Sequence, residues 1–313
     1  MRYIDLHCDT LTVCADKGLQ IVENDLQVSL EKLKKSCALA QCFAIFTNGK
    51  TARDDFEKYL SFYRQSMPKL KHIAVPIENF ADFYECERTS KIGFILTVEN
   101  LGFLGDDLDG IDRLKKEGVK MVSLVWNDEN LLARPNLIFK DGLPQFSLRE
   151  RCGLTPLGKE AVERLDANKI IVDISHLSDG GADDILADRK IPVVASHSNA
   201  QSVFDVSRNL SDDLIKKIAV TGGVIGVNFC KDFLGDDPVE SLTRHVKHII
   251  NVGGEDVIAF GSDFDGVPPY EEIPDCTRMQ YILERLSGAG IAQRVLEKLA
   301  RGNFLRVFKE VCG

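Results

Sequence analysis

The stretch YIDLHCDT at residues 3–10 begins as a short apolar strand and ends in polar side chains. Residues two apart on a strand point to the same side, so His7 and Asp9 should face one way at its carboxyl end. An imidazole and a carboxylate at this spacing form half of a site for a divalent metal. Taken alone, a helix-capping Asp9 and a buried, hydrogen-bonded His7 would be the simpler interpretation. The rest of the chain decides between them.

Short apolar runs recur along the chain, and helical segments separate most of them. The runs lie at residues 3–7, 38–46, 92–98, 120–125, 169–175, 191–196, 223–229 and 257–262. Alternation of strand and helix predicts a parallel sheet, and about eight such units predict an α/β fold of the (β/α)8 TIM-barrel type. An open doubly wound sheet is the alternative, but it usually carries a glycine-rich turn where this chain has HCD at 7–9. Residues 275–313 look helical and should pack outside the barrel.

Composition limits the classes of protein to which the chain can belong. Its 313 residues suit two ordinary domains or one large barrel, and no linker or repeat divides them, so we expect a single catalytic barrel domain over 1–313. A net charge of -9 disfavours binding to nucleic acid or to an anionic membrane surface. No apolar run is long enough for a membrane span. The amino terminus enters the first strand without a signal peptide, and the nine scattered cysteines indicate reduced thiols, so we expect a cytoplasmic protein.

Polar side chains suited to metal binding follow five of the predicted strands. They are His7, Asp9, Glu99, His176, His197 and Asp263. The carboxyl ends of barrel strands meet at one mouth, so all six should converge there. Each residue alone has a structural explanation, such as a helix cap, but their joint position favours a metal site. The donors suit zinc, manganese or iron, and one carboxylate can bridge two ions that activate a shared water for amide or ester hydrolysis.

Other candidate motifs are interpreted as structural. His245 and His248 lie three apart on a helix that precedes the last strand, so they should lie near the opposite face and serve helix surface or packing. His72, beside a lysine, indicates a solvated loop. A Ser–His–Asp triad would need a serine on a sharp G-x-S-x-G turn, and the chain has none.

At these residues the chain resembles the membrane (renal) dipeptidase family, the zinc-dependent peptidases of family M19, over nearly its whole length. The matching motifs are DLHCDT at 5–10, TVEN at 97–100, GLTPLG at 153–158, DISHLS at 173–178, SHSNA at 196–200, SRN at 207–209, GSDFDGV at 261–267, and GN at 302–303 with Arg306. Together these motifs are far more specific than any one of them.

The resemblance implies two divalent metal ions, Zn²⁺ in the family, and a role for each residue. One ion would be held by His7 and Asp9, the other by His176 and His197, with Glu99 as the bridge. Asp263 would take a proton from the attacking water and pass it to the leaving amine. Arg208 would pair with the terminal carboxylate of the substrate, for which a guanidinium is well suited.

The chain departs from the family after the fourth predicted strand. Better-known members carry a T-H-N sequence there, whose histidine contacts the region of the scissile carbonyl, and this chain has VWN at 125–127. By resemblance, Trp126 and Asn127 belong to the substrate-binding site. The indole N–H of Trp126 donates one hydrogen bond but carries no positive charge, so transition-state stabilisation should fall more heavily on the metals.

The sequence therefore predicts a metal-dependent dipeptidase for substrates with a free carboxyl-terminal carboxylate. The resemblance also admits a D-residue at that end, and a homodimer would be in keeping with it. Two alternatives stay open. One is another dinuclear barrel amidohydrolase for a cyclic amide, a lactam or a deamination substrate, although such enzymes often carry H-x-H after the first strand. The other is a metal-binding barrel that has lost catalysis.

Overall fold

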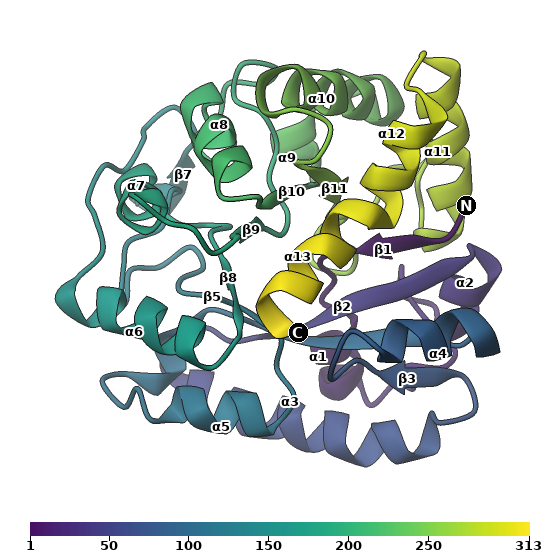
Figure 1. Ribbon diagram of the computed structural model, residues 1–313. Coiled ribbons are helices and arrows are strands. Elements are labelled where there is room, and N and C mark those ends of the chain that lie inside the picture. The colour runs from purple at the N-terminus through teal and green to yellow at the C-terminus, as the bar shows by residue number, and fades with distance from the viewer.

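The computed structural model describes residues 1–313, and its centre is a closed barrel of parallel strands (Figure 1). The barrel strands are β1 Tyr3–Asp5, β2 Ala38–Phe46, β4 Ile92–Glu99, β5 Met121–Ser123, β8 Ile171–Asp173, β9 Val194–Ala195, β10 Val224–Val227 and β11 Ile258–Phe260. Each strand pairs in parallel with the next, β1 pairs with both β2 and β11, and the pairing of β2 with β4 closes the ring. The predicted (β/α)8 barrel is confirmed.

Three short strands were not expected from the sequence. A short strand, β3 (Ala74–Pro76), pairs with the first part of β4 outside the ring. The predicted loop between β5 and the next helix contains an antiparallel hairpin of β6 (Ile138–Lys140) and β7 (Leu143–Gln145). Its two turn residues, Asp141 and Gly142, both have positive φ angles, of 52° and 76°. An Asp-Gly pair is a standard signal for such a turn, so the hairpin was detectable.

Helices connect the strands and surround the barrel. They are α1 Thr10–Lys17, α2 Leu30–Lys35, α3 Ala52–Ser66, α4 Asp82–Thr89, α5 Gly110–Lys116, α6 Pro156–Ala167, α7 Asp179–Leu186, α8 Asp212–Val220, α9 Lys231–Leu234, α10 Pro238–Gly253, α11 Met279–Gly288, α12 Gln293–Glu297 and α13 Asn303–Cys312. Local sequence sets several starts. At α6, the Thr155 side chain accepts a hydrogen bond from the Gly158 N–H and Pro156 follows it, as in a standard capped helix. None of the helices is long and apolar enough to cross a membrane.

The last helix closes the barrel at the end away from the strand carboxyl termini. Its apolar face, which includes Phe304, Val307 and Phe308, packs into one buried cluster with side chains from inside the barrel such as Ile4 and Val194. A larger apolar layer fills the space between the strands and the outer helices. These two layers hold the strands in place, so the residues that follow the strands are presented at the other mouth.

Two glycines allow the strands to approach closely beside the predicted site. A Cβ added to Gly226 would lie 2.1 Å from the backbone oxygen of Ser196, and one added to Gly261 would lie 1.8 Å from the same atom. Any larger residue would push the three chain segments apart. The position of Ser196, and hence of His197 after it, depends on this close packing.

Candidate metal centre

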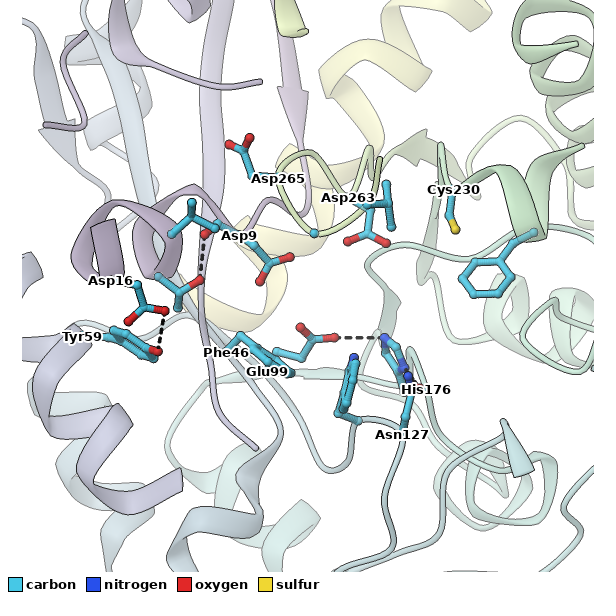
Figure 2. A pocket seen from close by; sticks show the side chains of 16 residues that line it. Asp9, Asp16, Phe46, Tyr59, Glu99, Asn127, His176, Cys230, Asp263 and Asp265 are labelled. Carbon is cyan, nitrogen blue, oxygen red and sulfur yellow. Dashed lines mark hydrogen bonds and ion pairs between the residues drawn. The ribbon is translucent and has the colours of Figure 1, made fainter. Parts of the chain in front are cut away.

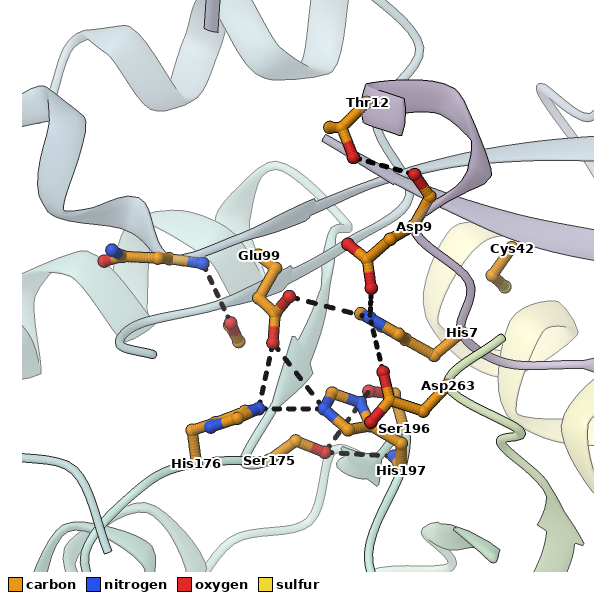
Figure 3. A network of polar contacts seen from close by, with 12 residues as sticks. His7, Asp9, Thr12, Cys42, Glu99, Ser175, His176, Ser196, His197 and Asp263 are labelled. Atoms are coloured by element: carbon orange, nitrogen blue, oxygen red, sulfur yellow. Dashed lines mark hydrogen bonds and ion pairs between the residues drawn. The ribbon is translucent and has the colours of Figure 1, made fainter. Parts of the chain in front are cut away.

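The six predicted strand-end residues lie together at the carboxyl mouth of the barrel (Figure 3). On one side, His7 Nε2 lies 3.5 Å from Asp9 Oδ2, 3.6 Å from Glu99 Oε2 and 3.8 Å from Asp263 Oδ1. All four side chains are buried. Strands β1, β4 and β11 therefore bring these groups to one point, although His7 and Asp263 are 256 positions apart in the sequence.

Glu99 also joins a second group of ligands. Its Oε1 atom lies 2.9 Å from His176 Nε2 and 3.6 Å from His197 Nε2, and the two Nε2 atoms are 2.9 Å apart. One carboxylate oxygen thus faces His7 and the other faces the histidine pair. This arrangement is the one required of a carboxylate that bridges two cations.

The local backbone turns sharply at two of these residues. His176 has a φ of 67° and Asp263 a φ of 64°, values in the left-handed region that most residues avoid. Such conformations concentrate at functional sites, where the surrounding structure enforces them. The capping explanation for Asp9 fails, because its side chain makes no capping hydrogen bond to α1.

Burial and charge shift the pKa values across the centre. Burial alone would lower the pKa of His7, but Glu99, Asp9 and Asp263 outweigh it and raise that pKa to about 10. Burial raises the pKa of Glu99 to about 8 and also raises that of Asp263. The centre therefore attracts positive charge strongly.

The other two histidines behave differently. Burial, together with the positive charges of Arg208 and His7, lowers the pKa values of His176 and His197 well below the ordinary histidine range. Neutral imidazoles have a nitrogen lone pair available to a metal. The electrostatics of the pair therefore suit metal binding.

The residues present fit divalent metal ions. His7 Nε2 and Asp9 Oδ1 are buried and have no hydrogen-bond partner, and Glu99 Oε1 lies close to His176 Nε2 without the geometry of a hydrogen bond. Such unsatisfied atoms are unusual among buried polar groups. Two sets of three ligand atoms lie within 4.8 Å of one another, one from His7, Glu99 and His197 and one from His7, Asp9 and Asp263. Cations among these atoms would satisfy all the orphaned groups, and imidazole with carboxylate suits zinc or a similar ion.

A cavity of ≈ 440 Å³ opens above the centre (Figure 2). Asp9, Glu99, His176 and Asp263 line it, and so do Trp126, which stands where the family pattern has a histidine, and Asn127, which matches that pattern. The Trp126 ring packs edge-on against Phe46, with ring centroids 4.9 Å apart. Asn127 also has a contact that the sequence did not indicate: its Oδ1 lies 2.9 Å from His176 Nδ1.

Arg208 is a buried cation with unused donors. It is only 1% exposed, its Nη1 donates to Ser198 Oγ at 3.1 Å, and its Nε and Nη2 have no partner. The guanidinium carbon lies 5.6 Å from the ring centroid of Phe233, which lines the cavity. Burial lowers its pKa, whereas Asp263 and Glu99 act in the opposite direction. Two of its donor atoms are therefore buried without a partner.

The histidines set aside in the sequence lie elsewhere. His245 is fully buried on α10, where it accepts a hydrogen bond from the Ala200 N–H and contacts the Leu234 carbonyl. His248 pairs with Asp212 at 2.7 Å. Neither contributes a ligand to the centre.

One polar neighbour of the centre was missed. Asn228 follows β10, and its Nδ2 donates to Asp263 Oδ2 at 2.9 Å. The rule that selected the six predicted residues, a polar side chain just after a barrel strand, applies equally to this asparagine. It escaped because amides were not counted among the metal-binding residue types.

Comparison with known proteins agrees with this geometry. A family model described as membrane dipeptidase (Peptidase family M19) matches residues 1–312. An uncharacterized protein in the pqqA 5′ region of Klebsiella pneumoniae is 31% identical over 238 residues, 74% of this chain and 86% of its own length. An uncharacterized dipeptidase of Schizosaccharomyces pombe is 27% identical over 99% of this chain and 80% of its own length.

A solved structure shares the fold over its full extent. It is a metallo peptidase from Rhodobacter sphaeroides, liganded with a phosphinate mimic of the dipeptide L-Ala-D-Ala. The TM-score is 0.91 at 22% identity, and the alignment covers 99% of each chain.

Proposed function

The chain belongs to the membrane dipeptidase family, peptidase family M19, and from this premise we propose that it hydrolyses the amide bond of dipeptides with a free carboxyl-terminal carboxylate at a two-zinc centre. The observation that carries the proposal is the position of Glu99. Its two oxygens face His7 on one side and the pair of His176 and His197 on the other, among buried atoms that lack partners.

Each ligand receives a role in this proposal. His7 and Asp9 would hold one ion, His176 and His197 would hold the other, and Glu99 would join the two halves of the site. Zinc in this site would lower the pKa of a water molecule and polarise the scissile carbonyl.

The chain's own residues handle protons and orientation. Asp263 is the general base and then the general acid. Burial raises its pKa, and the Asn228 amide fixes its Oδ2 atom, so its Oδ1 is left toward the centre. Arg208 binds the terminal carboxylate through the donors that have no partner in the protein. Trp126 and Asn127 form part of the wall against which the substrate lies.

The substrate's free carboxylate distinguishes this proposal from the alternatives. A cyclic amide or lactam without such a group would leave the buried guanidinium of Arg208 unpaired, at a cost. A protein that only bound metal would have no use for Asp263 beside the centre or for a buried cation. A dipeptide with a D-residue at the carboxyl end is included in the proposal, since the similar structure holds a mimic of one.

Hydrolysis of a dipeptide panel tests the proposal. L-Xaa-L-Xaa and L-Xaa-D-Xaa dipeptides, their carboxyl-terminal amides and one cyclic dipeptide are incubated with zinc-loaded and with chelator-treated protein. We expect zinc-dependent release of free amino acids from the dipeptides and little from the amides or the cyclic compound. Turnover of the cyclic compound alone would favour another amidohydrolase. No turnover of any compound with two metals bound would favour the binding protein.

A further inference from the structure

A buried hydrogen-bonded chain leads from Asp173, at the end of β8, through Ser196 to the far side of His197 (Figure 3 labels Ser196 and His197). The Ser196 hydroxyl lies 2.5 Å from Asp173 Oδ2 and 2.7 Å from His197 Nδ1. Asp173 is 5% exposed, and Ser196 and His197 at most 1%. The chain links a carboxylate outside the centre to one of its predicted ligands.

The direction of each bond follows from the donors available. Asp173 Oδ1 accepts the backbone N–H groups of Ser175 and Ser196, each at 2.9 Å, and Oδ2 accepts the Ser196 hydroxyl. Three donors to one side chain fit an ionised carboxylate, which can only accept. Since the single proton of Ser196 is given to Asp173, the contact between Ser196 and His197 requires His197 Nδ1 to be the donor.

The tautomer of His197 is thereby fixed. With the proton on Nδ1, the lone pair of Nε2 points toward Glu99 Oε1 and His176 Nε2. Metal-binding histidines commonly depend on such a partner for the nitrogen that does not bind the metal. His176 has a separate partner of this kind, the side-chain oxygen of Asn127.

We propose that Asp173 and Ser196 are positioning residues, which hold His197 in its Nδ1–H tautomer and so set the affinity of the His176–His197 half of the centre for its metal. The inference rests on the proposed two-metal function. It adds a dependence of one half of the centre on a carboxylate that touches neither a metal ligand nor the cavity.

The substitution Asp173→Asn tests which group donates and which accepts in each hydrogen bond between Asp173 and His197. The backbone N–H groups of Ser175 and Ser196 should retain the amide oxygen at the Oδ1 position, so the amide NH₂ faces the Ser196 hydroxyl. Ser196 then receives a proton from that side and donates its own to His197 Nδ1. The His197 proton moves to Nε2, where it blocks the metal.

Ser175 is one other possible acceptor for the hydroxyl proton of Ser196. Its Oγ lies 3.2 Å from that of Ser196. The double variant Asp173→Asn/Ser175→Ala removes this acceptor, so the His197 proton should move completely from Nδ1 to Nε2. Ser196→Ala is the second variant, useful if an Asp173 variant does not fold, because it removes the acceptor of the His197 proton without reversing any donor.

The protein contains a matched control for this substitution, the pair of Asp5 and Ser262. Asp5 accepts the backbone N–H of Ser262 at 2.7 Å and its hydroxyl at 2.6 Å, just as Asp173 does with Ser196. The residue after Ser262 is Asp263, so no histidine tautomer depends on this pair. Asp5→Asn should therefore perturb a similar buried bond without changing the tautomer of His197.

Two measurements decide the outcome. Nitrogen-15 NMR of histidine-labelled, chelator-treated protein reports which nitrogen of His197 is protonated, and competition with a chromophoric chelator reports the affinity for each of the two zinc ions. We expect Nδ1–H in the parent protein and in Asp5→Asn, and Nε2–H in the double variant. One zinc ion should bind about 10–100-fold more weakly in the double variant and in Ser196→Ala.

Failure of the inference can be told apart from failure of the proposed function. If the parent protein binds two zinc ions and hydrolyses dipeptides, but the double variant keeps the Nδ1–H tautomer and the parent affinities, the inference alone is wrong. Equal losses of affinity in Asp5→Asn would also overturn it, because the effect would then be structural. A parent protein that binds no zinc refutes the proposed function, and the NMR measurement still tests the tautomer.

Discussion

Replacement of Arg208 by methionine should reduce substrate binding and leave the fold intact or more stable. Methionine fills a similar volume and adapts to irregular space, so little packing is lost. Arg208 is nearly fully buried, makes one hydrogen bond and has no ion pair with any carboxylate, which makes it a poor contributor to stability. We therefore expect Arg208 to contribute to substrate binding rather than to the stability of the fold.

The substitution should lower kcat/KM but preserve or raise the free energy of unfolding. Loss of one partner of a buried charge pair costs about 2–5 kcal/mol, so kcat/KM for a dipeptide should fall by ~30-fold to several thousandfold at about 1.4 kcal/mol per factor of ten. Each unpaired buried donor costs the folded protein about 1–3 kcal/mol, and Arg208 has two such atoms. Lost attraction to Asp263 and Glu99 offsets part of that gain. We expect the free energy of unfolding to be unchanged or to rise by about 1–3 kcal/mol.

The assay compares a dipeptide with its carboxyl-terminal amide and measures urea unfolding of the zinc-loaded protein. Parent protein should prefer the free acid strongly, and Arg208→Met should lose that preference. Arg149→Met is the matched control, because Arg149 is a partly buried arginine whose Nε and Nη2 each lie 2.7 Å from a carboxylate oxygen of Asp179. That variant should lose stability and keep the preference. An unchanged KM with a large loss of stability in Arg208→Met would refute the reasoning.

Three further predictions concern the centre, its wall and the pH dependence of stability. Asp263→Asn should keep both zinc ions by metal analysis and lose about 10²–10⁴-fold in kcat; normal turnover would exclude the proton-transfer role. Trp126→His should raise kcat by roughly tenfold, because an imidazolium can stabilise developing negative charge. The variant should also lose about 1 kcal/mol of stability, because the ring contact with Phe46 is lost. An unchanged kcat would show that residue 126 does not take part in the reaction. Burial lowers the pKa of His245 to about 4, so between pH 6.5 and 4 the unfolded chain takes up a proton that the folded chain excludes. Stability should fall by up to about 3 kcal/mol across that window, and His245→Gln, followed by urea unfolding at each pH, should lack this part of the fall; identical profiles would show that His245 is not the cause.

The sequence predicts which side chains meet at the barrel mouth, because their positions follow from one rule. In a parallel barrel the strand carboxyl ends meet, so His7, Glu99 and His197 are placed together once the strands are recognised. Apolar runs mark the strands clearly, although the structure shortens some of them. The run at 191–196 contains only the two residues of β9, because pairing with its neighbours ends early.

Contacts across neighbouring strands were not predictable in the same way. The bond from Ser196 to Asp173 joins residues 23 apart, and nothing in either local pattern indicates which polar side chain reaches sideways. The same holds for Asn127, whose contact with His176 depends on how two loops pack. Strand β3 was missed because three residues are too few to show a period.

The left-handed backbone at His176 and Asp263 affects how the centre should be dissected by mutagenesis. An alanine at either position would have to hold a φ of 64° to 67° with no polar side chain to stabilise it. An alanine scan would therefore mix lost chemistry with a penalty for the backbone. Asparagine tolerates this conformation better than most residues. It is the replacement that isolates the contribution of the imidazole or the carboxylate at these two positions.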